Sequence, residues 1–130
     1  MNQSPFAGPP AVLVVEDEEI IRLDAVDLVK DAGFEAYEAA DSDEALRLLE
    51  AHGDIGILFT DVDIPGSMDG LTLAHAARRR WPPMRIIVAS GKLSLREPDL
   101  PAESAFFGKP YRPAQILVKL QEMARRAVRG

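Results

Sequence analysis

Acidic side chains follow two apolar segments of this 130-residue chain. Glu16 and Asp17 come directly after residues 11–15, and Asp61 comes directly after residues 55–60. If both segments are parallel strands, the carboxylates meet, because ligand sites in open α/β sheets lie outside the carboxyl ends of the strands. Three carboxylates about 4 Å apart would repel by roughly 4 kcal/mol per pair at an effective dielectric constant near 20. The cluster therefore predicts a bound cation, and a site made of oxygen ligands favours Mg2+ over zinc.

Short β-type segments alternate with stretches of helical periodicity, which indicates a parallel sheet wrapped by helices. Pro98 and Pro101 interrupt the interval 92–103, so we expect a fourth helix there to be short or irregular. The other helices are predicted at about residues 18–32, 42–52, 70–81 and from 113 onward. Apolar runs predict five strands, at residues 11–15, 34–39, 55–60, 84–89 and 104–108.

Apolar spacing also predicts which face of each helix is buried. The first helix carries its apolar residues at steps of four, three and four, and the later helices show similar stripes. The residues expected on buried faces are Ile21, Ala25, Leu28 and Ala32 in the first helix, Leu71, Ala74, Ala77 and Trp81 in the third, and Ile116, Leu120, Met123 and Ala127 in the last.

Composition limits the classes of protein to which the chain can belong. Its length and 47% hydrophobic content predict one globular domain, residues 11–130, after a disordered tail of residues 1–10. The formal net charge of −6 argues against direct nucleic-acid or membrane binding, since both favour basic surfaces. The sequence has no cysteine, no secretory leader pattern and no apolar run of membrane-spanning length, so we expect a cytoplasmic protein.

Five segments place polar residues at the ends of predicted strands, in a fixed order along the chain. Together they resemble the receiver (CheY-like) domain of two-component response regulators, of the stand-alone single-domain type. The resemblance implies a flavodoxin-like fold, a doubly wound five-stranded parallel sheet in the order 2-1-3-4-5 with helices on both faces. The matching segments are residues 14–18, 59–66, 68–70, 88–91 and 106–110.

The resemblance implies roles for the acidic residues. Asp61 would take a phosphoryl group from phosphohistidine and become an aspartyl phosphate, which is a form of carboxylate nucleophilic catalysis. Asp17 and Asp61 would bind Mg2+ directly, the carbonyl group of Asp63 would complete the protein ligands, and Glu16 would act through a water molecule. The chain would at most catalyse its own phosphorylation and dephosphorylation.

Residues at the other strand ends would neutralise charge and transmit the signal. Lys109 would neutralise charge on the phosphoryl oxygens, and the hydroxyl group of Ser90 would donate a hydrogen bond to one of them. An inward movement of Ser90 would vacate space that Phe106 could fill, so phosphorylation would become a two-state repacking. Pro110 resembles the cis-proline that follows the lysine in this family.

The family resemblance also implies partners. They would be a sensor histidine kinase or a histidine phosphotransfer protein, and an unidentified downstream protein that recognises the switched surface. We expect a monomer or a weak homodimer. No output domain follows Gly130 in this sequence, which favours action by protein contact or as a phosphate sink.

Three features depart from the common receiver pattern. Phe106 stands where many relatives carry tyrosine, and residues 65–70 form a loop one residue longer than usual. Asp63 lies two residues beyond the acceptor Asp61, and Lys92 lies two residues beyond Ser90. Our hypothesis is that they pair across the phosphoryl group and restrict the attacking water, which would lengthen the phosphorylated lifetime.

Other classes of protein share parts of this pattern. Asp61 and Asp63 after an apolar strand also resemble the nucleophile and acid of haloacid-dehalogenase-type phosphatases, although the chain has little room for that family's cap. A flavodoxin-like nucleotide binder would share the sheet order, but acidic residues 16–19 would repel a phosphate from the first loop. A receiver scaffold that is never phosphorylated is the third alternative.

Overall fold

The computed structural model describes residues 8–91 and 99–129. Residues 1–7, which make up most of the expected tail, lie outside this description. Lys92 lies outside it as well, together with most of the interval in which we expected a short or irregular helix.

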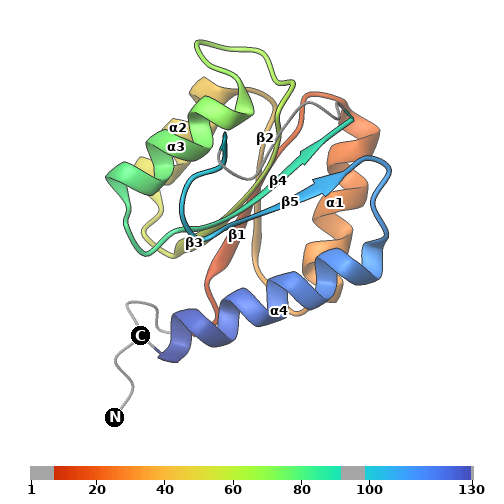
Figure 1. Ribbon diagram of the computed structural model, residues 1–130, viewed down its shortest axis with the longest axis vertical. Helices are drawn as coiled ribbons and strands as arrows, with labels where there is room; N and C mark the ends of the chain where they lie inside the picture. The colour runs from red at the N-terminus through yellow and green to blue at the C-terminus, as the bar shows by residue number, and fades with distance from the viewer. Residues whose placement is uncertain (1–7, 92–98, 130) are drawn as a thin grey trace.

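A single sheet of five parallel strands forms the centre of the molecule (Figure 1). Its order is β2-β1-β3-β4-β5, which confirms the predicted topology. Every residue of β1 and β3 is buried, as expected for central strands, whereas β2 at the edge is only partly buried. The strands are β1 Ala11–Val15, β2 Ala36–Ala39, β3 Ile55–Asp61, β4 Arg85–Ser90 and β5 Ser104–Gly108.

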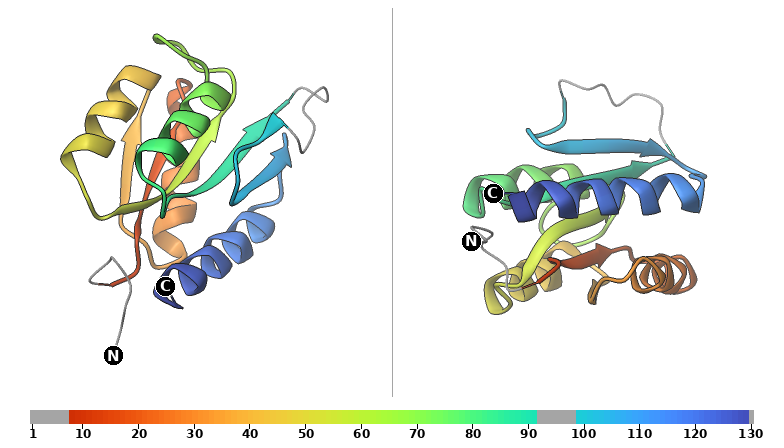
Figure 2. Two further views of the ribbon diagram at one scale, coloured as in Figure 1. Left: turned by 60° about the vertical axis from the view of Figure 1, so that its left-hand side comes forward. Right: turned by 90° about the horizontal axis from the view of Figure 1, so that it is seen from below.

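Helices cover both faces of the sheet, so the structure has three layers (Figures 1 and 2). α1 and α4 pack on one face, and α2 and α3 pack on the other. Alternate strand residues serve the two faces, because successive side chains of a strand point in opposite directions. The helices within the described residues are α1 Glu19–Asp31, α2 Ser42–Ala51, α3 Gly70–Arg80 and α4 Pro113–Arg129.

The core has two halves, one on each face of the sheet. In β1, Leu13 and Val15 belong to the half under α2 and α3, and Val12 and Val14 belong to the half under α1 and α4. These four side chains are at most 2% exposed. Burial on both faces holds β1 and β3 rigidly at the centre of the sheet, so the residues that follow each strand start from fixed positions.

Side-chain caps fix where two helices begin. Asp41 accepts a hydrogen bond from the backbone of Glu44 at 2.7 Å and caps α2. The Glu44 side chain accepts from the backbone of Ala40 at 2.9 Å, one residue before the cap residue itself. Asp69 accepts from the backbone of Thr72 at 2.8 Å and caps α3 directly after the loop that follows β3.

The predicted buried stripes were right for the last helix and partly wrong for the first. Ile116, Leu120 and Met123 of α4 are buried as expected, and the side chain of Ala127 lies outside the description. In α1 the buried residues are Ala25, Val26 and Val29, whereas Ile21 and Leu28 are only partly buried. α1 is therefore rotated relative to the predicted stripe, and two large apolar side chains remain at the surface between α1 and α4.

Candidate functional site

Asp61 is the last residue of β3 and is buried, with its side chain 10% exposed. It lies beside Ala89 of β4, and the backbone of Val62 donates to the Ala89 carbonyl at 3.0 Å. The Thr60 hydroxyl donates to the Asp61 carbonyl at 2.8 Å. Because strand pairing and a side-chain hydrogen bond hold the Asp61 backbone, its carboxylate has a defined position.

Gly70, the first residue of α3, makes close contact with the backbone of Asp61. A β-carbon at this position would overlap the Asp61 carbonyl oxygen, and the Thr60 hydroxyl would lie only 2.9 Å away. The backbone of Gly70 donates to the carbonyl of Val62 at 2.8 Å. Glycine therefore lets α3 begin directly against the strand end that carries Asp61. The sequence marked Gly70 only as a helix start.

The carboxylates of Glu16, Asp17 and Asp61 converge, with oxygen atoms within 4.8 Å of one another. Glu16 is 4% exposed, whereas Asp17 is exposed at the mouth of the cluster. Their convergence agrees with the expectation drawn from the two strand ends, β1 and β3, which are neighbours in the sheet.

Lys109, which directly follows β5, contacts two of these carboxylates. Its ammonium nitrogen lies 3.0 Å from Glu16 Oε1 and 3.2 Å from Asp61 Oδ2. Burial alone would lower the pKa of Lys109, but the hydrogen bonds and charges of Glu16 and Asp61 outweigh it and raise that pKa. Burial raises the pKa of Glu16, opposed by hydrogen bonds from the Glu18 backbone and Lys109.

The donor chemistry fits a hard divalent cation. Among the described residues, three carboxylates face the Lys109 ammonium group, so this part of the cluster keeps negative charge that a bound cation would neutralise. All of the candidate ligand atoms are oxygens, which suit Mg2+. Asp17 is exposed and leaves the cluster open to solvent, so an ion could enter with part of its water shell.

The other predicted site residues in the described part of the chain lie on β4, on β5 and in the loops that follow β3 and β5. Ser90 ends β4, is 1% exposed, and its carbonyl accepts from the backbone of Lys109 at 2.8 Å. Phe106 of β5 pairs with Val88 and is partly buried against the core half beneath α2 and α3. Asp63 is exposed in the loop after β3, and the Lys109–Pro110 peptide bond is cis.

The long loop after β3 is held by α2. The backbone of Ser42 donates to the Pro65 carbonyl at 3.1 Å, and its hydroxyl accepts from the backbone of Met68 at 3.2 Å. The Ser67 hydroxyl donates to Asp43 at 2.7 Å. Gly66 has a φ of 113°, and a β-carbon there would overlap the Ser42 hydroxyl. These contacts fix the loop that forms one edge of the acidic cluster.

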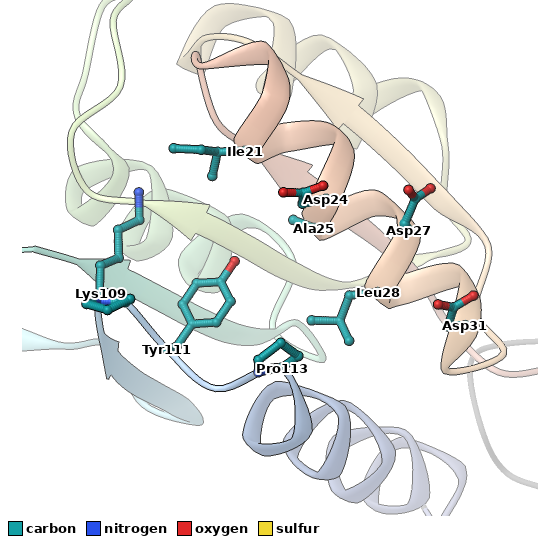
Figure 3. Close-up of a pocket in the computed structure, with 10 residues that line it drawn as sticks. Ile21, Asp24, Ala25, Asp27, Leu28, Asp31, Lys109, Tyr111 and Pro113 are labelled. Atoms are coloured by element: carbon teal, nitrogen blue, oxygen red, sulfur yellow. The ribbon is translucent and has the colours of Figure 1, made fainter.

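A groove of about 690 Å³ opens beside Lys109, between α1 and the segment that joins β5 to α4 (Figure 3). Tyr111 stands in this groove, and its ring packs 5.8 Å from that of Phe59, measured between centroids. The sequence did not predict the groove, because it depends on the rotation of α1 described above. Its lining residues are Ile21, Asp24, Ala25, Asp27, Leu28, Asp31, Lys109, Pro110, Tyr111 and Pro113.

Residues 12–121 match the family model of the response regulator receiver domain. The chain belongs to this family. Receivers accept a phosphoryl group in two-component signalling, and the match does not favour the alternatives of a phosphatase or an unphosphorylated scaffold. No helix in the described part of the chain has the length and hydropathy needed to cross a lipid bilayer.

Similar proteins carry this receiver within longer chains. The sequence is 34% identical over 122 residues to the sensor kinase CckA of Brucella abortus, covering 91% of this chain and 13% of CckA. It is 30% identical over 118 residues to the transcriptional regulatory protein PdtaR of Mycobacterium tuberculosis, covering 88% of this chain and 57% of PdtaR. The receiver thus spans less than two thirds of either relative.

A solved structure shows the same receiver fold. The crystal structure of a response regulator receiver protein from Sinorhizobium medicae superimposes with a TM-score of 0.83 at 26% sequence identity. The match covers 91% of this chain and 96% of that one. The expected fold class is therefore confirmed both by the strand order and by comparison with an experimental structure.

Proposed function

We propose that Asp61 accepts a phosphoryl group from the phosphohistidine of a sensor histidine kinase or a histidine phosphotransfer protein. The observation that carries the proposal is the position of the Asp61 carboxylate, which lies in the acidic cluster with the Lys109 ammonium 3.2 Å away. The Asp61 carboxylate therefore has the positive charge of Lys109 beside it, and the exposed Asp17 leaves the cluster open to solvent.

In this proposal an Asp61 oxygen attacks phosphorus, the phosphorus–nitrogen bond of phosphohistidine breaks, and an aspartyl phosphate forms. Glu16, Asp17, Asp61 and the carbonyl group of Asp63 would hold Mg2+. When bound, Mg2+ supplies positive charge to the phosphoryl oxygens. The Lys109 ammonium contacts Glu16 and Asp61 in the structure. After transfer it would pair with the negative charge on the phosphoryl oxygens.

Ser90 and Phe106 would convert phosphorylation into a change of surface. Ser90 is buried at the end of β4, and β4 pairs with β5, which carries Phe106. If the Ser90 side chain moves toward the phosphoryl group, the packing of β5 changes as well. Phe106 is only partly buried and has no phenol hydroxyl, which leaves packing as the force that selects its rotamer. A downstream protein would recognise the repacked surface.

The groove beside Lys109 supports docking of the phosphohistidine donor. Leu28 and Pro113 give it apolar walls, and Asp24, Asp27 and Asp31 place carboxylates along α1 (Figure 3). A donor domain whose helix has an apolar stripe and basic neighbours would complement both features. We place this receiver in the cytoplasm, together with its donor. We also propose that the receiver is a monomer or a weak homodimer.

Asp63 and Lys92 are proposed to set the phosphorylated lifetime. Asp63 is exposed and lies two residues after Asp61, from where its side chain could cover the phosphoryl group. Dephosphorylation of Lys92→Ala should be faster than that of the native protein, because the water that attacks phosphorus would be less restricted. An unchanged rate would remove this pair from the proposal.

Intact-mass analysis with acetyl phosphate tests the proposed function. We expect one phosphoryl group on each native molecule with Mg2+ and none with EDTA. Asp54→Asn is the matched control, because it removes an exposed carboxylate that bonds Tyr37 just before β3 begins, at the opposite end of the strand from Asp61. Turnover of a small phosphoester for many cycles per molecule would instead support a phosphatase, and no labelling under any condition would support an unphosphorylated scaffold.

A further inference from the structure

Arg22 of α1 connects the edge of the sheet to the backbone of the acidic loop. Its Nε donates to Glu38 Oε1 at 2.9 Å, and its Nη1 donates to the Glu16 carbonyl oxygen at 3.0 Å. The Arg22 side chain is 16% exposed, so the guanidinium lies against the protein although its partner Glu38 is 44% exposed. Nothing in the sequence pattern set this arginine apart from a surface residue of an amphipathic helix.

Glu16 is held from several directions. Its backbone nitrogen donates to the Ala39 carbonyl at 3.0 Å, and its carboxylate accepts from the backbone of Glu18 at 3.1 Å. Arg22 holds the other polar backbone atom of Glu16, its carbonyl oxygen. Because the peptide group is planar, fixing this oxygen also fixes the plane from which the Asp17 residue continues.

Asp17 depends on that plane more than its neighbours do. Glu16 and Asp61 are buried and contact Lys109, whereas the Asp17 side chain is exposed at the mouth of the cluster. Its carboxylate can stay within 4.8 Å of the other two only if the backbone points it there. Partners that orient a ligand in this way affect metal affinity even though they do not touch the ion.

We propose that Arg22 is a positioning residue for the divalent-cation site, acting through the Glu16 carbonyl to aim the Asp17 carboxylate into the cluster. This inference rests on the proposed function, because it assigns Arg22 to the same cation site. A lysine could not replace it fully, since the two bonds come from separate nitrogens of one planar guanidinium.

The ion pair with Glu38 has a separate, smaller role. Solvent screens the ion pair on the side of Glu38, which is 44% exposed, so this contact chiefly orients the guanidinium. Glu38→Gln keeps an acceptor for Arg22 and leaves the bond to Glu16 intact. This variant separates loss of the ion pair from loss of the carbonyl contact.

The test is calorimetric titration of the full chain with Mg2+. Arg22→Met removes every donor but keeps an unbranched apolar stem in place, so the helix should remain packed. We expect about tenfold weaker Mg2+ binding by Arg22→Met, in the range found for loss of a group that orients a metal ligand. Arg22→Lys should recover part of that loss, and Glu38→Gln should stay close to native.

Arg80→Met is the matched control, because Arg80 also forms an ion pair, at 2.6 Å with Glu50, but on α3 away from the acidic loop. Its Mg2+ affinity should equal that of the native protein. Equal affinities for native and Arg22→Met overturn the inference alone, as does an equal loss in Arg80→Met. A native protein that binds no Mg2+ overturns the cation site itself and this inference with it.

Thermal unfolding in EDTA supplies the second readout. Without metal, Arg22→Met should unfold at a somewhat lower temperature than Arg80→Met, because it loses the hydrogen bond to the Glu16 carbonyl oxygen as well as an ion pair. Added Mg2+ should raise the unfolding temperature of Arg80→Met more than that of Arg22→Met, because stabilisation by a ligand follows its affinity. Equal increments in both variants would count against a positioning role.

Discussion

The ammonium group of Lys109 lies 3.2 Å from the carboxylate of Asp61 and therefore joins the end of β5 to the end of β3. The same group lies 3.0 Å from Glu16 after β1. One cation thus bridges acidic residues from the two central strand ends. It offsets part of the repulsion that the cluster would otherwise suffer without metal.

Removal of this cation should destabilise the metal-free protein. In EDTA we expect the free energy of unfolding of Lys109→Met to be about 1–2 kcal/mol lower than that of the native protein. This loss lies between the values for exposed and buried ion pairs. Mg2+ should then bind more tightly, because no ammonium group competes for the carboxylate oxygens. Lys119→Met, which loses only a pair with Glu122 on α4, is the control. Unchanged metal-free stability in urea titrations would contradict the role of Lys109.

The contribution of Lys109 should depend on pH in a defined direction. Burial opposes its charged form, but contacts with Glu16 and Asp61 raise its pKa above that of an unfolded lysine. The difference in stability between native protein and Lys109→Met should therefore be fully present below the unfolded lysine pKa of about 10.4. It should be lost as the pH rises through the higher folded value. A difference that grows in the alkaline range would have the wrong sign.

In the absence of metal, Glu16 should show the same direction with pH as Lys109, but for a different cause, because here burial itself raises the pKa. Burial raises its pKa, so the protonated form is favoured more in the folded than in the unfolded state. The stability that native protein has relative to Glu16→Gln should be greatest below the unfolded glutamate pKa. It should fall as the pH rises through the folded value. Urea titrations across this range in EDTA measure the trend, and a rise with pH would disprove it.

Gly70 should tolerate no side chain. Gly70→Ala forces a methyl group onto the Asp61 carbonyl, and we expect a loss of about 1–3 kcal/mol, the usual cost of overpacking. Phosphorylation should slow as well, because the displaced backbone carries the acceptor carboxylate. Gly53→Ala is the control, since a β-carbon there meets nothing within 4 Å. Equal unfolding midpoints for the two variants would show that the contact has no consequence.

Apolar runs placed all five strands to within two residues, and the order of the strands followed from the resemblance to receiver domains. β1 and β5 have the predicted bounds, because each is a short apolar run between clear interruptions. Glu16, Asp17 and Asp61 could be placed together because parallel strands bring their carboxyl ends to one edge.

The remaining features depend on tertiary packing that local patterns do not encode. Leu28 fits the apolar stripe of α1, but the position of α1 beside α4 buries Val29 and leaves Leu28 at the groove. Gly70 needs to be glycine only because α3 begins against β3. Arg22 gains its role from two partners in different segments, and neither is near enough in sequence for helical spacing to reveal the contact.

Phosphopeptide mapping of acetyl-phosphate-treated protein tests the central claim most directly. Rapid digestion and tandem mass spectrometry, with Mg2+ present during labelling, should assign the added phosphoryl group to Asp61. Asp61→Asn should carry none under the same conditions. A phosphoryl group on another residue of the native protein, or equal labelling of Asp61→Asn, would contradict the claim that this carboxylate is the acceptor.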